Sequence, residues 1–238
     1  MDLSWLYEGR EVLLGITGGI AAYKVPELVR LFTKAGAQVQ GISTEAGLRF
    51  VSPLALETLC GRPVLFQGLQ ITPEGQIPHI HFAQRADLFV VAPATANTLA
   101  KLANGIADDL VSTTALAYKR PPVIAPGMNV DMWAHPATQA NVRVLKERGA
   151  LFIGPEPGEL ACGVTGLGRM SEPQRILEGS AALLVDRGLM GRKVLVTAGS
   201  TQEPWDPVRF LGNRSTGLMG QAVARAAAAR GAHVTLVA

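Results

Sequence analysis

Residues 11–20 read EVLLGITGGI and decide the fold of the first part of the chain. The run 11–16 is short and apolar with breakers on both sides, which is typical of a strand buried in a parallel sheet. Residues 17–19 form a turn of small residues, and residues 21–35 then carry apolar side chains at helical spacing. The stretch therefore predicts a strand, a tight turn and a helix.

The same alternation continues along the chain. We expect further strands at residues 38–42, 86–93, 121–126 and 150–153, and helices opening at 43–45 and spanning 95–103, 109–118 and 136–148. Such alternation predicts a doubly wound parallel sheet of the flavodoxin or Rossmann type, with helices on both faces. Residues 154–171, with five glycines and two prolines, predict a long functional loop, and a helix is expected from 171 to 187.

A domain boundary is expected at residues 188/189. The length of 238 residues exceeds one ordinary domain, and 48% apolar with 17% charged residues excludes a largely disordered chain. Up to residue 188 there are 16 Lys and Arg against 17 Asp and Glu, whereas the remainder has 6 against 2. A strand–glycine–helix order restarts at 193–197, so residues 189–238 predict a second Rossmann-like domain. No Lys/Arg cluster with interleaved aromatics supports nucleic-acid binding.

The composition also bears on location. No apolar run approaches the roughly 18 residues that a transmembrane helix needs, and the N-terminus lacks the pattern of a secretory signal. Two cysteines, Cys60 and Cys162, cannot make a disulfide framework. We therefore expect a cytoplasmic protein with reduced thiols and no membrane partner.

Two turns of small residues are candidates for ligand binding. Residues 17–19 follow the first strand, and residues 93–98 (PATANT) follow the most apolar strand. Ligands of open α/β sheets bind beyond the carboxyl ends of strands, so both turns are expected at one crevice with a nucleotide-like ligand. The alternatives are a plain tight turn and a plain helix N-cap at Thr95 or Asn97.

Three further segments carry chemically useful side chains. His79 and His81 would share one side of a strand but be splayed apart by a helix, and either is an acid/base candidate or an ordinary histidine. With no further ligand at suitable spacing, we predict no metal site. Residues 125–133 (APGMNVDMW) place Asn129 among Met128, Met132 and Trp133. These apolar side chains either keep water away from a binding site at Asn129 or only fill the core. Residues 160–170 (LACGVTGLGRM) place Cys162 among glycines, which favours a chemical role.

Five segments occur in the order GITGGIAAYK, HIHFAQRAD, PATANT, PGMNVDMW and ACG…GRM. Together they resemble the homo-oligomeric flavin-containing cysteine decarboxylases, in particular the phosphopantothenoylcysteine decarboxylases of coenzyme A biosynthesis, with their PASANT and PxMNxxMW motifs. The resemblance covers residues 9–187. It implies FMN as cofactor, conversion of 4′-phosphopantothenoyl-cysteine to 4′-phosphopantetheine, and a trimer or dodecamer. In this family the flavin takes a hydride from the carbon bearing sulfur, CO2 leaves, and the hydride is returned.

The resemblance also implies roles for individual residues. His79 is the implied catalytic histidine, Asn129 the residue that holds the substrate carboxylate, and Cys162 the proton donor on a flexible flap. The implied substrate contacts are Asn129, Met132, Ala161, Gly163 and Arg169. The implied FMN contacts are Thr17, Gly18, Gly19, Ser43, Ala94, Thr95, Ala96, Asn97 and Met128. Val164 departs from the Asp that often follows ACG in the family.

The tail carries a second resemblance. Residues 196–204 (VTAGSTQEP), 206–210 (DPVRF) and 212–217 (GNRSTG) resemble the start of phosphopantothenate–cysteine ligase, which bacteria commonly fuse behind the decarboxylase. Asn213 matches the residue such ligases use around the acyl-nucleotide intermediate, whereas Leu218 stands where Lys is usual. The complete ligase half would use CTP and Mg²⁺. We expect a chain cut short in its second domain and without ligase activity.

Other functions fit the residues less well. A peptidyl-cysteine decarboxylase or a prenyl-flavin synthase would share the fold, but residues 126–133 and the ligase-like tail argue against both. A non-enzymatic FMN-binding regulator would lack the chemistry of Cys162. A dehydrogenase is the weakest alternative, because GxGxxG and its following acidic residue are missing.

Overall fold

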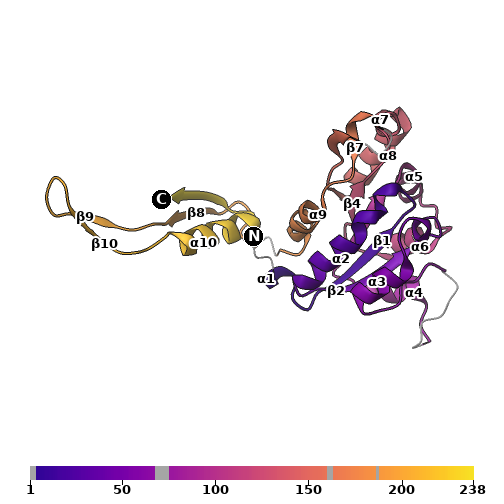
Figure 1. Ribbon diagram of the computed structural model, residues 1–238, viewed down its shortest axis with the longest axis horizontal. Coiled ribbons are helices and arrows are strands. Elements are labelled where there is room, and N and C mark those ends of the chain that lie inside the picture. The colour runs from indigo at the N-terminus through magenta and orange to yellow at the C-terminus, as the bar shows by residue number, and fades with distance from the viewer. Residues whose placement is uncertain (1–3, 68–74, 160–162, 186–187) are drawn as a thin grey trace. The chain divides into compact units, whose positions relative to one another are not determined.

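A computed structural model describes residues 4–67, 75–159, 163–185 and 188–238, in two compact units, Met1–Leu184 and Val185–Ala238. Unit 1 is built on a five-stranded sheet with the order β2-β1-β3-β4-β5, and all its strand pairs are parallel (Figure 1). Its strands are β1 (Glu11–Ile16), β2 (Gln38–Ser43), β3 (Leu88–Ala94), β4 (Val123–Pro126) and β5 (Leu151–Phe152). The predicted doubly wound, flavodoxin-like sheet is confirmed, with its switch point between β1 and β3.

Helices cover both faces of this sheet. One group packs around α2 and contains α2 (Val25–Lys34), α3 (Pro53–Cys60) and α9 (Pro173–Ser180). The other group contains α4 (Pro78–Arg85), α5 (Ala96–Asn104), α6 (Leu110–Ala117) and α8 (Pro136–Glu147). The shorter elements are α1 (Ser4–Tyr7), η1 (Ile20–Lys24), η2 (Gly47–Arg49), α7 (Val130–Ala134) and η3 (Ala181–Leu183).

The core lies where the strands are most apolar. Every residue of β3 is buried, as expected for a central parallel strand covered on both faces. Phe89 packs with Leu110 and Val111 of α6 in a continuous apolar cluster. Gly15 of β1 lies beneath them, and a Cβ there would come within 3.0 Å of Val111 and 3.1 Å of Phe89. The central strands are thus closely packed against α6 near the carboxyl edge of the sheet.

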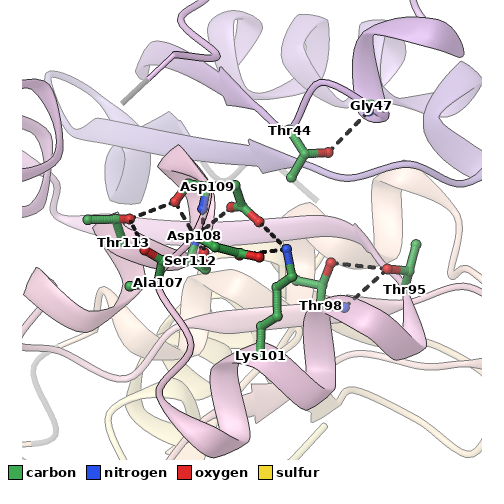
Figure 2. Close-up of polar contacts among 10 residues, drawn as sticks. All are labelled: Thr44, Gly47, Thr95, Thr98, Lys101, Ala107, Asp108, Asp109, Ser112 and Thr113. Atoms are coloured by element: carbon green, nitrogen blue, oxygen red, sulfur yellow. Dashed lines mark hydrogen bonds and ion pairs between the residues drawn. The ribbon is translucent and has the colours of Figure 1, made fainter. Parts of the chain in front are cut away.

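Two predicted helices differ in the structure. The helix expected at 21–35 is a 3-10 turn, η1, followed by α2. Pro26 has no N–H to donate to the carbonyl of Ala22, so the α-helical ladder cannot extend back to the glycine turn. No helix opens at residues 43–45, because Gly47 N donates to Thr44 Oγ1 at 3.1 Å and closes a local turn (Figure 2).

The prediction of a long loop at residues 154–171 is wrong for the residues that the structure describes. Residues there form an antiparallel hairpin of β6 (Glu156–Glu159) and β7 (Thr165–Arg169). Along β7, Gly166 and Gly168 face the protein while Thr165 and Leu167 face outward. The inward face is glycine, so the sequence lacks the apolar alternation that reveals a strand. The helix expected at 171–187 is shorter, with α9 followed by η3.

Unit 2 has its own parallel pair, β8 (Lys193–Thr197) with β11 (His233–Val237), joined through α10 (Leu218–Ala229). A second pair, β9 (Gln202–Pro204) and β10 (Phe210–Gly212), is antiparallel and exposed. The two strands are connected by a turn in which Asp206 Oδ1 accepts hydrogen bonds from the backbone of Val208 and Arg209. These hydrogen bonds hold the pKa of Asp206 below its usual value. In the parts of the chain that are described, no helix has the length and apolarity to cross a membrane.

Candidate active site

A cavity of about 1710 Å³ opens at the carboxyl ends of the central strands of unit 1. It is lined by the turns that follow β1, β3 and β4, together with residues 44–46, His79 and the end of β7. Pockets for one small ligand usually have about 300–1,000 Å³, so this cavity can hold two ligands side by side. It lies where open α/β sheets bind their ligands.

Thr17 joins the two predicted ligand-binding turns. Its side chain is 1% exposed, and Oγ1 donates to the carbonyl of Pro93 at 2.6 Å. The backbone N–H of Thr95 donates to the same Oγ1 at 3.4 Å. The predicted convergence of both turns on one crevice is therefore confirmed, and one buried hydroxyl sets their spacing.

The turn after β1 packs closely against Ala46, in the segment that follows β2. A Cβ on Gly18 would lie 2.5 Å from Cβ of Ala46, so only glycine fits there. The backbone N–H of Gly19 donates to the carbonyl of Thr17 at 3.0 Å, and η1 rather than an α-helix follows. The first α-helix after this turn starts only at Val25.

The N-terminus of α5 does face the cavity. Thr95 is its N-cap, and Oγ1 accepts from the backbone N–H of Thr98 at 3.2 Å (Figure 2). Ala96 and Asn97 form the first helical positions and line the cavity. The first backbone N–H groups of a helix have no partner within the helix, which makes this end suitable for an anionic group. The N-cap interpretation and the ligand interpretation of this motif are thus compatible.

A charged cluster missed by the sequence analysis forms another wall of the cavity. The ammonium of Lys101 lies 2.6 Å from Asp108 Oδ1 and 2.8 Å from Asp109 Oδ2 (Figure 2). Asp109 also caps α6, accepting at Oδ1 from Ser112 N at 2.8 Å. Hydrogen bonds to Asp108 and Asp109 raise the pKa of Lys101, and Lys101 lowers the pKa of Asp108. The spacing of Asp109 and Ser112 is a capping-box pattern that could have revealed this end of α6.

The two histidines lie on a helix, α4, and are splayed apart. His79 lines the large cavity, whereas His81 lines a separate pocket of about 360 Å³ beside Glu11 and Arg62. Nδ1 of His79 is buried and has no hydrogen-bond partner among the described residues. The strand alternative is excluded, and His79 is the histidine that faces the cavity.

The turn after β4 presents Asn129. This residue is the N-cap of α7, and its Oδ1 accepts from the backbone N–H groups of Asp131 at 2.8 Å and Met132 at 3.4 Å. These bonds fix the plane of the amide at the cavity wall. Met132 is 48% exposed and lines the cavity. Met128 also lines the cavity, and both Met128 and Trp133 pack against the core. Of the predicted Met/Trp cluster, Met128 and Trp133 are thus partly core filler.

A third wall carries positive charge. The Lys24 side chain is 8% exposed, and Nζ lies 2.9 Å from Glu172 Oε1 and 3.4 Å from the carbonyl of Met170. Arg169, a predicted substrate contact, pairs with the same carboxylate and lines the cavity. The hydrogen bond from Lys24 lowers the pKa of Glu172. Two cations therefore share one anion on this wall.

Some predicted contacts lie elsewhere. Ser43 is fully buried and its Oγ donates to the carbonyl of Thr44 at 2.9 Å, and Ala94 belongs to the core; neither lines the cavity. Gly163 is exposed and also absent from the cavity wall. Ala161 and Cys162 lie outside the described residues.

Asn213 lies in unit 2, where its Oδ1 accepts a hydrogen bond from Ser215 N at 3.0 Å. Within the described ranges of both units, no group of three or more His, Cys, Asp or Glu side chains is arranged to hold a metal ion.

Comparison with known proteins agrees with this geometry. Residues 4–185 match the protein family described as "Flavoprotein". The chain belongs to this flavoprotein family. Residues 189–238 match the "DNA/pantothenate metabolism flavoprotein C-terminal domain". The two matches fall on the two compact units of the flavoprotein.

Curated relatives of this flavoprotein carry the name "Coenzyme A biosynthesis bifunctional protein CoaBC". The protein from Mycobacterium tuberculosis is 49% identical over 235 residues, which are 96% of this chain and 56% of the relative. The Bacillus subtilis protein is 47% identical over 235 residues, covering 98% and 58%. The Escherichia coli K12 protein is 46% identical over 230 residues, covering 96% and 57%. The flavoprotein thus spans little more than half the length of these relatives.

Several solved structures also resemble this chain. A PPC decarboxylase mutant complexed with pantothenoylaminoethenethiol is 32% identical, with a TM-score of 0.66 and coverage of 72% of this chain and 96% of that chain. The FMN binding protein AtHal3 is 32% identical, with a TM-score of 0.64 and coverage of 72% and 94%. The FMN-dependent cysteine decarboxylase SpaF is 31% identical, with a TM-score of 0.61 and coverage of 73% and 98%.

Proposed function

We propose that unit 1 binds FMN and decarboxylates 4′-phosphopantothenoyl-cysteine to 4′-phosphopantetheine, a step of coenzyme A biosynthesis. The observation that carries this proposal is that His79 and Asn129 line one cavity at the sheet switch point. The likeness to a PPC decarboxylase and to CoaBC proteins supports the same activity. The cavity volume of about 1710 Å³ accommodates a cofactor and a substrate together.

The residues around the cavity fit FMN. Gly18 lets the turn after β1 pack directly against Ala46 in the cavity wall, and Thr17 links this turn to Thr95 by a hydrogen bond. The N-terminus of α5, at Ala96 and Asn97, offers backbone N–H groups to an anionic or carbonyl group. We infer that these residues hold FMN. Ser43 would not contact FMN directly. Its hydroxyl would position the backbone of Thr44, which lines the cavity.

The substrate has no electron sink β to its carboxylate, and bound flavin would supply one by accepting and returning a hydride. Asn129 would orient the substrate carboxylate, since its amide plane is fixed by the cap of α7. His79 would exchange a proton at Nε2, because Nδ1 is buried in the wall. Lys24 and Arg169 give one wall of the cavity a positive charge that suits the phosphate of the substrate. Cys162 would donate the final proton to the decarboxylated intermediate, completing its reduction.

Two exposed apolar side chains beside the cavity support a homo-oligomer. Ile20 and Tyr23 of η1 line the cavity and are 58% and 63% exposed. Burial against another subunit would remove this apolar surface from water. We propose a trimer or dodecamer in the cytoplasm, and light scattering of the purified chain tests the assembly. A monomer that turns over substrate would contradict it.

Residues 189–238 are proposed as the first part of the ligase domain that follows the decarboxylase domain, residues 1–188. The match to the C-terminal domain family and the longer bifunctional relatives support this division. Asn213 would then act at the acyl-nucleotide intermediate in a complete form that uses CTP and Mg²⁺.

The two histidines offer a matched test of the decarboxylase. The variant His79→Asn is expected to lose product formation while it retains bound FMN, because it alters the cavity wall. The variant His81→Asn changes the separate pocket and is expected to keep wild-type turnover. Equal activity of both variants, measured as CO2 release at saturating FMN, would overturn the assignment.

A further inference from the structure

Strand β7 of the β6–β7 hairpin lies directly against the turn that carries Asn129. The backbone N–H of Met128 donates to the carbonyl of Gly168 at 2.9 Å. In the other direction, a Cβ on Gly168 would lie 2.3 Å from the carbonyl oxygen of Met128 and 3.4 Å from the carbonyl carbon of Asn129. Strand β7 and the turn therefore touch backbone to backbone, with no side chain between them.

Gly166, two residues before Gly168 on β7, makes a second close contact with the same turn. A Cβ on Gly166 would lie 2.9 Å from Cγ2 and 3.1 Å from Cγ1 of Val130. Gly166 and Gly168 share the inward face of β7 because side chains alternate along a strand, whereas Leu167 between them is 43% exposed. The glycines thus form a flat strip that follows residues 128–130.

The far end of β7 is held from another direction. Met170 is 1% exposed, and its carbonyl accepts a hydrogen bond from the ammonium of Lys24 at 3.4 Å. Lys24 also pairs with Glu172 at 2.9 Å, just before α9. Moving the strand away from the turn would break the hydrogen bond from Lys24 to the Met170 carbonyl, so the strand is held from both sides.

We propose that Gly168 is a positioning residue, which sets the place of Asn129 at the cavity wall by direct contact between β7 and the turn. This inference rests on the proposed decarboxylase function of the same site. An alanine at position 168 needs a displacement of about 1 Å to restore ordinary van der Waals contact. The atom it meets is a backbone oxygen, so the displacement passes to Asn129 rather than to a flexible side chain.

The test is a double-mutant cycle on decarboxylation at saturating FMN. A misplacement of about 1 Å in a catalytic site can cost about 100-fold, so Gly168→Ala is expected to lower kcat/KM by about 10- to 100-fold. If it acts through Asn129, the pair Gly168→Ala/Asn129→Ala will lose little more than Asn129→Ala alone. The control Leu167→Ala, on the outward face of the same strand, is expected to stay within about twofold of wild type.

A side-chain rescue keeps the test valid if Gly168→Ala does not fold. Gly166→Ala is expected to lower kcat/KM, and Gly166→Ala/Val130→Ala to restore most of it, because the clash at this position is with the Val130 methyls. Additive losses in the cycle, an unaffected Gly168→Ala enzyme, or no rescue by Val130→Ala would overturn the inference. Absence of turnover in the wild-type chain would instead overturn the proposed function.

Discussion

Replacing Thr17 by valine tests the hydroxyl that joins the two central turns. The side chain is 1% exposed, and its Oγ1 donates to the Pro93 carbonyl at 2.6 Å and accepts from Thr95 N at 3.4 Å. Valine preserves the shape of the side chain but leaves a buried carbonyl without this donor. Leaving a buried group unsatisfied costs about 1–3 kcal/mol. Thr17→Val is therefore expected to lower the free energy of unfolding of unit 1 by about 1–3 kcal/mol, a roughly 5- to 150-fold change in the unfolding constant.

The matched control is Thr17→Ser, which keeps the hydroxyl and loses one buried methyl group, at a cost of about 1 kcal/mol. Urea unfolding can be followed by fluorescence of Trp5 and Trp133 in a Trp205→Phe background, because Trp205 is the tryptophan of unit 2. The valine variant should also bind FMN more weakly than the serine variant, since only valine loses the link between the turns. Equal FMN affinity of the two variants, with valine no less stable than serine, would refute the reasoning.

Three further predictions concern titratable groups. Lys101→Met should lower the free energy of unfolding most near neutral pH and least in acid. The pair with Lys101 lowers the pKa of Asp108, and its stabilising effect is lost as the pH falls through that lowered pKa. Urea midpoints from pH 2 to 8 measure the difference between variant and wild type, and a difference that does not change with pH would contradict the prediction. Asp109→Ala should lower the free energy of unfolding by about 1 kcal/mol more than Asp109→Asn does, because asparagine can still cap α6. Urea unfolding measures both variants, and equal losses would show that the cap does not stabilise the protein. Burial raises the pKa of the Cys60 thiol to about 11, so in a Cys162→Ser background iodoacetamide should label native protein far more slowly than unfolded protein at pH 8; equal rates would show an accessible thiolate.

The sequence predicted the sheet well because its strands are buried on both faces. The first strand matches β1 residue for residue, and the β3 run is apolar throughout, so both stand out as continuous apolar segments. The start of α2 could not be placed by apolar spacing alone. There Pro26 removes one N–H donor, and this single missing bond converts the first turn into η1.

The site was predictable where short motifs follow strands. The turns at Thr17 and Thr95 were expected at one edge, and the structure joins them by a hydrogen bond. The contacts of Lys101 with Asp108 and Asp109 were missed, because they depend on how the chain turns between α5 and α6. Strand β7 was missed because its inward face is glycine, which carries no hydropathy signal.

The most direct test of the central claim is to incubate the purified chain with FMN and 4′-phosphopantothenoyl-cysteine and to follow the product by mass spectrometry. The decarboxylase assignment predicts FMN-dependent formation of 4′-phosphopantetheine with release of one CO2 per substrate. A chain that binds FMN at the cavity but leaves the substrate unchanged would contradict it.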